Sequence, residues 1–470
     1  MRIPEKVEYI LKKLKENQFE GYAVGGCVRD SILGRTPGDW DITTSARPEE
    51  VKGIFRRTVD TGIKHGTVTV LIGGEGFEVT TYRLDGKYED HRHPKQVEFT
   101  PNLEEDLKRR DFTINAMAYS PESGIVDLFD GMGDMERKCI RCVGNPRERF
   151  SEDALRMLRG IRFAGQLGFG IEENTEVAIG ELADTIEKVS MERIRVEINK
   201  LLLSNGAEKL KLAEKTGLCH HFLPEFSRML DTTQNNPNHC YDVGNHSLCA
   251  VRHVQELYRQ MRGQMPQELS PYEREYPDQK VETILVFSAL LHDVGKTVCK
   301  TTDESGTDHF YRHDEKGCEM AHDIMRRLRF DNDTIQMVTR IVRYHERRYN
   351  GSRKALRRLM SQAGAEVMPY LFLIQEADVL SQSDYNREEK LARIKEAREM
   401  YLEIVRGHEA VSIRQLEVNG KDLIELGIQP GPEVGRVLQK LLEIVIEEPD
   451  KNNKKLLLTE AKKHIKIYTE

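Results

Sequence analysis

Two patterns of hydrophobic residues divide this chain, and the division limits its fold more than any other feature. Up to about Leu128, short apolar runs separated by glycine-rich turns alternate with helical patterns. Beyond about Glu148, nearly every segment carries apolar residues at the i, i+3, i+4 spacing of an amphipathic helix. We therefore expect an α+β protein in which an α/β head is followed by an all-α remainder.

The length of the chain, 470 residues, exceeds what one hydrophobic core supports, so several domains are expected. The segment 230–245, LDTTQNNPNHCYDVGN, is polar and rich in turn-forming residues, which is typical of a linker. Together with the change of pattern, this linker leads us to expect four domains, which span residues 1–145, 146–228, 229–400 and 401–470.

The composition favours a protein of the cytoplasm. Charged residues make up 32% of the chain and aromatic residues 7%, and the formal net charge is −7. No apolar run is long enough to cross a bilayer, and the first residues lack the pattern of a signal peptide, so we expect no membrane association. The eight cysteines are sparse, which favours reduced thiols, and the single CxxC of Cys139 and Cys142 is weak evidence for zinc.

The sequence GGCVRDSILGR begins with a glycine pair directly before a helical pattern. Gly25 and Gly26 would let the backbone approach a bulky anion, because glycine has no side chain and adopts turn conformations freely. The N-terminal amides of the following helix, together with the guanidinium of Arg29, could then hold a triphosphate. A tight turn without a ligand would have the same sequence, so this motif alone decides little.

Two aspartates in DWDITT point to a metal ion. If this segment is a strand, Asp39 and Asp41 lie on the same face, because side chains alternate along a strand. Like charges at that distance repel one another unless a cation lies between them, and Mg²⁺ prefers carboxylate and phosphate oxygens. Glu78, in the expected hairpin of TVTVLI and FEVTTYR, is a third candidate. Three such acids would form a two-metal catalytic site for phosphoryl transfer.

The combination of these motifs resembles the polymerase-beta-like nucleotidyltransferases. Three further sequences, RRDFTINAMAY, EDALRMLRGIRFAGQLGF and ERIRVE, resemble successive signatures of the bacterial-type (class II) CCA-adding tRNA nucleotidyltransferases and their relatives, the bacterial poly(A) polymerases. The resemblance extends from about Gly21 to Leu203, with further matches downstream. It implies a polymerase-beta-like head, a helical neck, an HD-domain body and a helical tail. It also implies Mg²⁺ in the head, CTP and ATP as substrates, and tRNA as the partner.

The helical sequence EDALRMLRGIRF would carry the residues that choose the nucleotide. Asp153 and Arg156, one helical turn apart, offer a hydrogen-bond acceptor beside donors. Cytosine and adenine present an amino group beside an acceptor nitrogen and match this pair, whereas guanine and uracil present the reverse. Each mismatch would leave a buried polar group unpaired, at a cost of ~1–3 kcal/mol. The spacing lets Arg159 and Arg162 reach the same nucleotide, and the resemblance adds Arg110 as another contact.

Several alternatives remain open. The charged segment YRLDGKYEDHRHPKQVEF, residues 82–99, resembles the mobile loop that complete CCA-adding enzymes need for the final A, yet an enzyme that adds only A would share the template helix. A poly(A) polymerase is disfavoured because its basic insertion near the D-x-D strand is missing. Two other classes are an HD phosphohydrolase with a non-catalytic, RNA-binding head, and a non-catalytic RNA-binding protein.

The helical half holds a second group of metal-ligand residues, in the order H…HD…D. The sequences YDVGNHSLCAV, ALLHDVGK and EADVLSQS supply the candidate ligands, which are His246, His292, Asp293 and Asp378. This order resembles the HD-domain phosphohydrolases and implies a transition metal or Mg²⁺. Such a domain could remove 2′,3′-cyclic or terminal phosphates that block a tRNA end, and a helical body with an idle metal site is the alternative. His313 and His345 are extra candidates, close to the metal or facing phosphate.

Two segments of the second half suggest contacts with nucleic acid. Residues 340–359 hold many cations and the single acid Glu346, which suits either a phosphate-backbone contact or a solvated helical face. Near the C-terminus, the glycines and prolines between 427 and 432 join two helical patterns. By resemblance this tail grips the tRNA elbow, although a plain helix hairpin would have the same sequence. The sequence identifies no protein partner.

Overall fold

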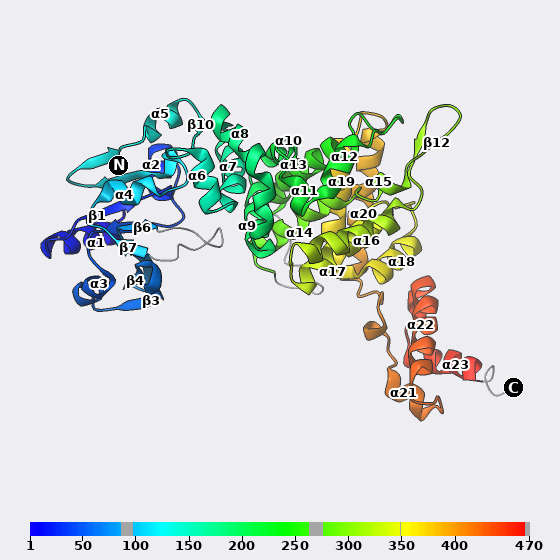
Figure 1. The fold of residues 1–470 in the computed structure, drawn as a ribbon. Coiled ribbons are helices and arrows are strands. Elements are labelled where there is room, and N and C mark those ends of the chain that lie inside the picture. Colours follow the sequence, from blue (N-terminus) through cyan, green and yellow to red (C-terminus); the bar gives the residue numbers. More distant parts are fainter. Residues whose placement is uncertain (86–96, 263–275, 348, 466–470) are drawn as a thin grey trace. The chain divides into compact units, whose positions relative to one another are not determined.

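The computed structural model describes residues 1–85, 97–262, 276–347 and 349–465. The chain divides into two compact units, Met1–Pro224 and Glu225–Glu470. The large β-sheet belongs to the first unit, and helices make up most of the second (Figure 1). This confirms the α+β class and the order of an α/β head before helices. The expected loop of residues 82–99 falls largely on residues 86–96, which lie outside the described residues.

The sheet of the first unit has seven strands in the order β3-β4-β5-β2-β1-β8-β9. Their bounds, in that order, are Thr58–Gly62, Thr67–Ile72, Glu75–Thr81, Ile42–Thr44, Gly21–Val24, Met117–Ser120 and Gly124–Asp127. Strands β2 and β5 run parallel, and the other neighbours are antiparallel. The expected hairpin is confirmed as β4 and β5, which are joined at Gly73 and Gly74, both with positive φ, as a two-residue turn requires.

Helices flank this sheet: α1 Glu5–Glu16, α2 Gly26–Ile32, α3 Pro48–Ile54, α4 Leu103–Lys108 and α5 Gly131–Glu136. Helix α1 forms as its pattern predicts, because Val7, Ile10, Leu11 and Leu14 recur at helical spacing and are all buried. Strand β1, residue Gly25 and α2 reproduce the predicted order of strand, glycine turn and helix.

The rest of the first unit is mainly helical. Its helices are α6 Pro146–Glu152, α7 Leu155–Leu167, α8 Glu173–Leu182, α9 Met191–Leu202, α10 Leu210–Lys215 and α11 Cys219–Phe222. The first unit also has two small two-stranded sheets. One pairs β6 Arg83–Asp85 with β7 Val97–Phe99, and the other pairs β10 Cys139–Ile140 with β11 Gly170–Ile171. Helix α7 lies close to its neighbours because residue 165 is glycine. A Cβ there would lie 2.6 Å from Leu201 Cδ1 and 2.9 Å from the carbonyl oxygen of Gly206.

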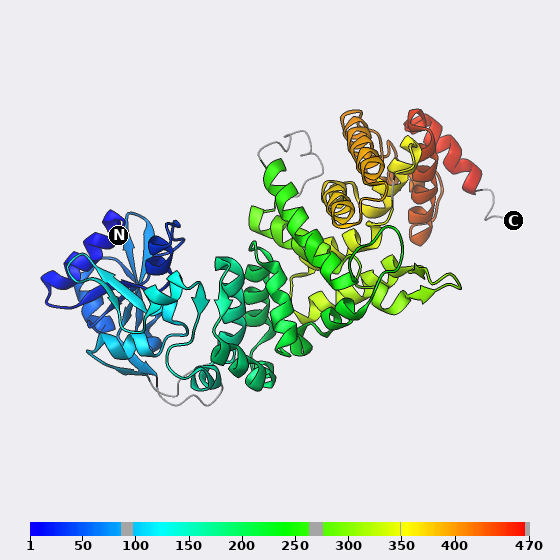
Figure 2. The ribbon, with the colours of Figure 1, turned by 90° about the horizontal axis from the view of Figure 1, so that it is seen from above.

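The second unit begins with α12 Pro224–Asp231, which straddles the division, and continues with a bundle of helices. Their bounds are α13 Val243–Met261, α14 Asp278–Leu291, α15 Lys296–Cys299, α16 His313–Arg327, α17 Asn332–Tyr344, α18 Arg353–Ala363, α19 Met368–Ser381 and α20 Arg387–Arg406. A short hairpin, β12 Thr301–Thr302 and β13 Asp308–His309, interrupts them. Figure 2 shows the green and yellow helices packed against one another. Helices α14 and α19 are apolar nearly all round, as central helices of a bundle are.

The C-terminal segment has a hydrophobic cluster of its own. It comprises α21 Gly420–Glu425, α22 Pro432–Glu447 and α23 Lys454–Ile465. Leu423, Leu441 and Leu457, one from each helix, are fully buried together. The glycine- and proline-rich turn therefore does open a helix, as its sequence predicts, with Pro432 at the first helical position.

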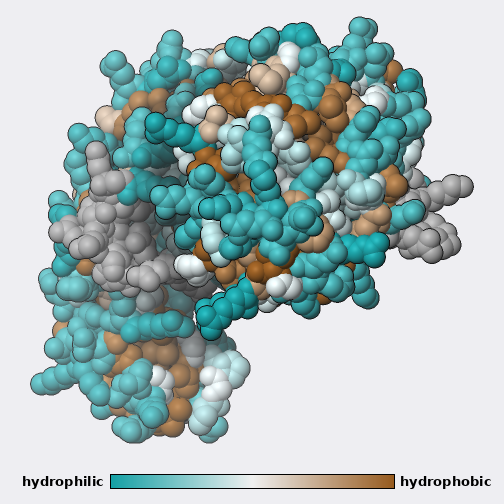
Figure 3. All heavy atoms as spheres, turned by 90° about the vertical axis from the view of Figure 1, so that its left-hand side faces the viewer, coloured by the Kyte–Doolittle hydropathy of each residue, from teal (hydrophilic) through white to brown (hydrophobic). Residues whose placement is uncertain are grey.

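The face of the molecule drawn in Figure 3 is largely polar. Hydrophilic side chains cover most of the face drawn in Figure 3, with smaller hydrophobic areas between them. Among the helices of the described residues, none is both long enough and apolar enough to span a membrane. All eight cysteines are free, as the sequence predicts.

Candidate active site and metal centre

The glycine turn of the head has a backbone that only glycine adopts readily. Gly25 has φ +83°, and a Cβ there would lie 3.1 Å from Nη1 of Arg110, so this guanidinium rests on the turn. Arg29 projects from the first turn of α2, and its charge is held within the protein. It donates to Oδ1 of Asn115 at 2.6 Å and to both carboxylate oxygens of Asp30 at 2.9 Å.

The paired aspartates lie directly before a strand rather than within one. Strand β2 begins at Ile42, so the expectation that Asp39 and Asp41 share one face of a strand is wrong. The reason is that β1, the partner of β2, turns away at Gly25, which leaves the residues before Asp41 without a ladder. The last hydrogen bond between the two chain segments runs from the backbone N–H of Val24 to the carbonyl oxygen of Asp41, at 3.0 Å.

The sheet nevertheless brings Asp41 beside Glu78. Ile42 pairs with Val79 in the parallel ladder of β2 and β5, so the residues one step earlier on each strand are neighbours. Desolvation by the surrounding protein atoms, followed by the negative charges of Asp39 and Glu78, raises the pKa of Asp41 to about 6, although the residue is exposed at the surface. Arg110 acts on the same carboxyl in the opposite direction. Three acids and one cation therefore face one region beside the glycine turn.

These three carboxylates remain exposed to solvent, where a metal and a nucleotide have access. They are spaced more widely than the ligands of the second unit. Among the described residues, two groups bring three or more candidate ligand atoms within 4.8 Å of one another, and both lie in the second unit. The donor set of the head, with oxygen atoms alone, fits Mg²⁺ bound through carboxylates and substrate phosphates.

The sequence expected to form one helix around Asp153 is broken at this residue. Helix α6 ends at Glu152, α7 starts at Leu155, and Asp153 has extended backbone angles, φ −141° and ψ 105°. Its side chain explains the break, because Oδ1 accepts from the backbone N–H of Leu155 at 3.1 Å, as aspartate does at helix starts. Oδ2 accepts from Nη2 of Arg193 at 2.7 Å.

The arginine at position 156 has partners that position it beside Asp153. Its Nη1 donates to Glu152 and to the carbonyl oxygen of Arg149 at 3.1 Å, and its Nη2 donates to the carbonyl oxygen of Arg109 at 3.1 Å. The backbone N–H of Arg156 also donates to the carbonyl oxygen of Asp153, at 3.0 Å. The two residues therefore stay one turn apart although the helix is interrupted, and their role as nucleotide readers stays a prediction.

The other two arginines of this ladder make internal ion pairs. Arg159 donates to Oδ2 of Asp111 through Nε at 2.8 Å and Nη2 at 2.6 Å. Arg162 is buried, donates to Glu197, and lies 3.8 Å from the centre of the Phe163 ring. These contacts support packing of α7 on its neighbours, and a contact of Arg159 or Arg162 with a nucleotide stays a prediction.

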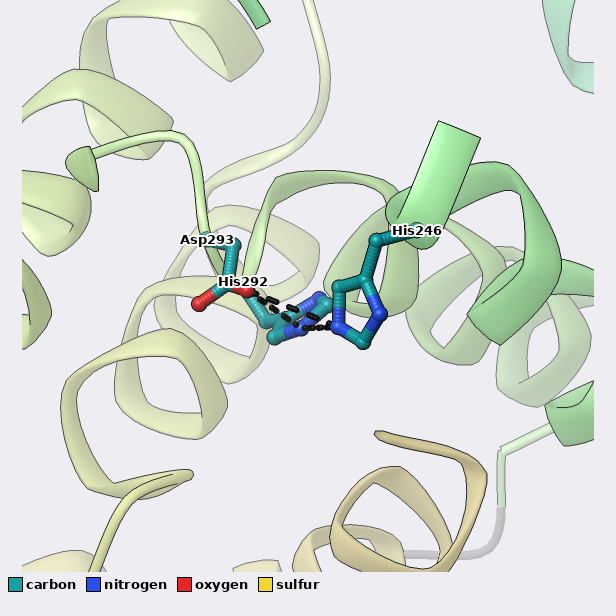
Figure 4. A group of neighbouring side chains, drawn as sticks. All are labelled: His246, His292 and Asp293. Atoms are coloured by element: carbon teal, nitrogen blue, oxygen red, sulfur yellow. Dashed lines mark hydrogen bonds and ion pairs between the residues drawn. The ribbon is translucent and has the colours of Figure 1, made fainter. Parts of the chain in front are cut away.

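The second unit gathers the predicted HD residues at one buried point, and Figure 4 draws three of them, His246, His292 and Asp293. Nε2 of His246 lies 3.2 Å from Nε2 of His292, 3.1 Å from Oδ1 of Asp378 and 3.5 Å from Oδ2 of Asp293. Nε2 of His292 lies 3.3 Å from the same oxygen of Asp293. Helices α13 and α19 and the end of α14 therefore bring together all four predicted ligands, which are far apart in the sequence.

The environment of this group favours positive charge. Burial alone would lower the pKa of His292, but the carboxylates of Asp293 and Asp378 raise it to about 10. Burial would raise the pKa of Asp293, but His292 and Lys296 hold it well below its usual range. Lys296 Nζ lies 2.7 Å from Oδ2 of Asp293. This fully buried oxygen accepts no hydrogen bond of good geometry, so the group fits a metal cation.

The basic segment 340–359 is engaged within the second unit. Arg340 donates to Glu366 at 2.9 Å, and Arg343 donates to Asp314 and to Glu315. Further along, Arg353 and Arg357 both donate to Glu409, and Arg358 lies 3.4 Å from Glu447. The acids that pair with these arginines lie elsewhere in the sequence. The net charge of residues 340–359 alone therefore does not show that the cations are paired.

Sequence reasoning missed several residues of both sites. Asp111, Glu197 and Arg193 hold the arginine ladder and Asp153, and their only signal lay within the sequences RRDFTINAMAY and ERIRVE. In the second unit, Lys296 lies at the end of the sequence ALLHDVGK, which supplies His292 and Asp293. His239 came from the presumed linker, and its Nδ1 is buried without a hydrogen-bond partner.

Four known families match successive parts of the chain. Residues 21–141 match the poly A polymerase head domain, and residues 168–230 match the family described as the probable RNA and SrmB-binding site of polymerase A. Residues 243–383 match the HD domain, and residues 315–461 match tRNA nucleotidyltransferase domain 2. A head of this kind implies dependence on a divalent metal ion.

Individual proteins show the same likeness. The chain is 48% identical over 239 residues to the CCA-adding enzyme of Leuconostoc mesenteroides, covering 50% of this chain and 60% of that one. It is 54% identical over 200 residues to the CCA-adding enzyme of Lactobacillus delbrueckii, covering 43% and 50%. The matched segments thus span about half the length of these curated relatives.

A solved structure extends the likeness to the whole fold. The crystal structure of the Bacillus stearothermophilus CCA-adding enzyme in complex with CTP superposes with a TM-score of 0.69 at 28% identity, over 99% of both chains. The likeness thus extends over nearly the whole length of both chains. In the geometry of its head and the order of its four matched families, the chain is similar to the bacterial CCA-adding enzymes, and its residues 243–383 match the HD domain.

Proposed function

We propose that this protein adds C, C and A to the 3′ ends of tRNA, without a nucleic-acid template, from CTP and ATP. The observation that carries the proposal is the parallel register of β2 and β5, which brings Asp41 beside Glu78 next to the Gly25 turn. The relatives named CCA-adding enzymes, one of them solved with CTP, support the same activity.

In this proposal the tRNA 3′-hydroxyl attacks the α-phosphate of the nucleotide, a new P–O bond forms, and pyrophosphate leaves. Asp39 and Asp41, with Glu78 as a third acid, would hold Mg²⁺, which when bound supplies activation of the hydroxyl and stabilises the leaving group. Gly26 and the first amides of α2 would receive the triphosphate, with Arg29 behind them. Arg110, which rests on Gly25 and faces Asp41, would neutralise the same phosphates.

Base choice would lie with Asp153 and Arg156. Each is already oriented by a neighbour, since Arg193 donates to Asp153 and Arg156 donates to Glu152. A side chain that is held in place loses little conformational entropy when a base binds, which strengthens discrimination. Cytosine and adenine would satisfy both groups, whereas guanine and uracil would leave both unpaired.

The HD residues would support a second activity. His246, His292, Asp293 and Asp378 would hold a transition metal or Mg²⁺, and imidazole ligands favour the transition metal. This domain would remove 2′,3′-cyclic or terminal phosphates from damaged tRNA ends, so that the head finds a free hydroxyl. A cytoplasmic location belongs to the proposal as well. An enzyme that adds only A is the second candidate, because the Asp153 site would look the same.

The decisive experiment uses tRNA lacking one, two or three terminal nucleotides, each incubated with one labelled nucleotide. We expect incorporation of C, C and then A, with no use of GTP or UTP and no long A tail. Asp41→Asn should lower incorporation about a thousandfold without loss of tRNA binding. Addition of A alone would favour the A-adding enzyme, a long tail would favour a poly(A) polymerase, and equal use of UTP would refute base choice by Asp153 and Arg156.

A further inference from the structure

The strand order of the head separates two sides of its proposed catalytic acids. Asp41 and Glu78 lie at β2 and β5, whereas the Gly25 turn and α2 follow β1, the neighbour of β2 on the side away from β5. In the proposed function, the triphosphate occupies the side of β1. The attacking and leaving oxygens of phosphoryl transfer lie roughly in line, on opposite sides of the phosphate. The 3′-hydroxyl should therefore arrive from the side of β5, β4 and β3.

One face of these three strands leads from Glu78 to the edge of the sheet. The opposite face is covered, and its buried side chains in β4 and β5 are Val68, Val70, Phe77 and Val79. Because side chains alternate along a strand, Glu78 points the other way. It pairs with Thr69 of β4, which pairs with Val59 of the edge strand β3 (Figure 1). Two strand spacings, about 10 Å, thus separate Glu78 from Val59.

A second row of residues runs beside the first. Gly76 pairs with Leu71, whose backbone N–H donates to the carbonyl oxygen of Arg57 at 3.0 Å. Since residue 76 has no side chain, the surface stays low next to Glu78. Leu71 and Val59 are 37% and 45% exposed, so the face offers apolar contact area to a molecule that lies on it.

The second row ends in a hollow at the open edge of β4. The hollow is lined by Tyr9 of α1, by Ile54 and Phe55 at the end of α3, and by Arg56, Arg57 and Leu71. The Tyr9 side chain is exposed there. An aromatic ring beside two guanidiniums is the combination that binds single-stranded nucleic acid, because bases stack on rings and phosphates pair with cations.

The charge of these two arginines is not neutralised by the protein. Two acids of this edge are already paired, since Lys52 lies 3.0 Å from Asp60 and Lys6 lies 2.7 Å from Glu75. Arg56 and Arg57 are exposed, and neither side chain forms an ion pair or a hydrogen bond with any residue that the structure describes. The edge therefore has a local excess of positive charge, which attracts an anionic chain.

We propose that this surface, made of Val59, Leu71 and the hollow with Tyr9, Arg56 and Arg57, binds the nucleotides that precede the 3′ end of the tRNA. The phosphates would contact the two arginines, and the terminal hydroxyl would reach the acids at Glu78. Such contacts do not depend on the base, which suits an end whose last letters change as C, C and A are added. The inference rests on the proposed function and adds the place where the acceptor end lies.

Kinetics of the full chain test this inference, with tRNA that lacks the terminal A and labelled ATP. Arg56→Gln/Arg57→Gln should raise the KM for tRNA about tenfold and leave kcat and the KM for ATP within about twofold. The plot of log KM for tRNA against log salt should become shallower by about 1.4, because each contact with a single-strand phosphate contributes about 0.7. Arg56→Lys/Arg57→Lys keeps the charge and should resemble wild type.

The matched control is Lys12→Gln/Lys15→Gln. It removes the same charge from exposed positions of α1, and Lys15 pairs with Glu122, at the turn between β8 and β9 on the other edge of the sheet. This control should keep the wild-type KM for tRNA. Thermal unfolding of all variants is measured alongside, and because the four positions are exposed or at the surface, we expect unchanged midpoints.

Crosslinking maps the position of the acceptor end directly. The tRNA carries a photoreactive azidophenacyl group on a phosphorothioate before the last, the second-last or the third-last nucleotide. We expect the second and third positions to crosslink to peptides that contain residues 54–59. Crosslinks from these positions to other parts of the chain alone would overturn the inference.

The kinetic outcomes separate this inference from the proposed function. An unchanged KM for tRNA and an unchanged salt dependence in the folded Arg56→Gln/Arg57→Gln variant would overturn the inference and leave the function. The arginines would then serve only to keep the edge strand from pairing with other chains. A rise in the KM for ATP instead would place them at the nucleotide. No incorporation by the wild-type protein would overturn both.

Discussion

Arg159 and Asp111 form a doubly hydrogen-bonded ion pair, in which Nε and Nη2 donate to one carboxylate oxygen at 2.8 and 2.6 Å. The other oxygen of Asp111 accepts from Nδ2 of Asn115 at 3.2 Å, and Asn115 in turn accepts from Arg29 at 2.6 Å. A continuous network thus joins the helix after the glycine turn to the helix that follows Asp153. In the proposed function, it links the triphosphate end of the nucleotide to its base end.

This network should make the stability of the first unit depend on acid pH. Burial would raise the pKa of Asp111, but Arg159 lowers it to about 2, from an ordinary value near 3.8. A lowered pKa stabilises the fold above the ordinary value, and this stabilisation disappears as the pH falls from about 4 towards 2. It amounts to about 2 kcal/mol. Urea unfolding of wild type and Asp111→Asn at pH 6 and pH 3 measures it, and equal pH dependence of both proteins would contradict the assignment.

The neighbours Asp41 and Glu78 should both be needed for nucleotide transfer. Asp41→Asn should lower CTP incorporation about a thousandfold, because a metal ligand contributes several kcal/mol to the transition state. Glu78→Gln should lower it in the same direction and raise the Mn²⁺ concentration needed for activity. Glu75→Gln, on the same strand and exposed, is the matched control. Full activity of Glu78→Gln at every metal concentration would show that Glu78 is not a metal ligand of this site.

The hydrogen bond from Arg193 to Asp153 should matter for base choice rather than for transfer itself. Arg193→Met removes the donor that lies 2.7 Å from Oδ2 of Asp153, so the carboxylate would take several orientations. We expect the preference for CTP over UTP to fall about tenfold, the equivalent of one lost hydrogen bond to a charged group. The ratio of the two kcat/KM values measures this, with Glu192→Gln as the exposed control. An unchanged ratio would show that the hydrogen bond from Arg193 to Asp153 does not contribute to base choice.

Two neighbouring arginines of α18 should differ sharply in their effect on stability. Arg357 is buried, donates to the carbonyl oxygen of Ile446 at 2.8 Å and to Glu409 at 2.7 Å, and so ties the tail to the bundle. Arg357→Met should destabilise the second unit by about 2–3 kcal/mol, because it leaves buried acceptors unpaired. Arg358→Met, at an exposed position, should change stability little. The two variants are compared by thermal unfolding and by proteolysis of the tail. Equal destabilisation by Arg357→Met and Arg358→Met would refute this role of Arg357.

The sequence by itself determined those features that depend on neighbouring residues. The two-residue turn at Gly73 and Gly74, the burial of one face of α1 and the glycine turn before α2 follow from local rules for backbone and hydrophobic spacing. The sequence patterns around the HD residues likewise identified four side chains, those of His246, His292, Asp293 and Asp378, that the fold brings together. The matched families and the similar CCA-adding enzymes support the family expected from the motifs.

Only the tertiary structure decided which charged groups are partners. Asp153 ends a helix because its side chain binds a backbone N–H, and it meets Arg193 from another helix. The cations of residues 340–359 find acids such as Glu409, which no local window contains. His313 and His345 lie beside Asp293 because Gly295 permits close packing of α16. Electrostatic partners are chosen by distance in space, and the order of residues along a chain does not specify that distance.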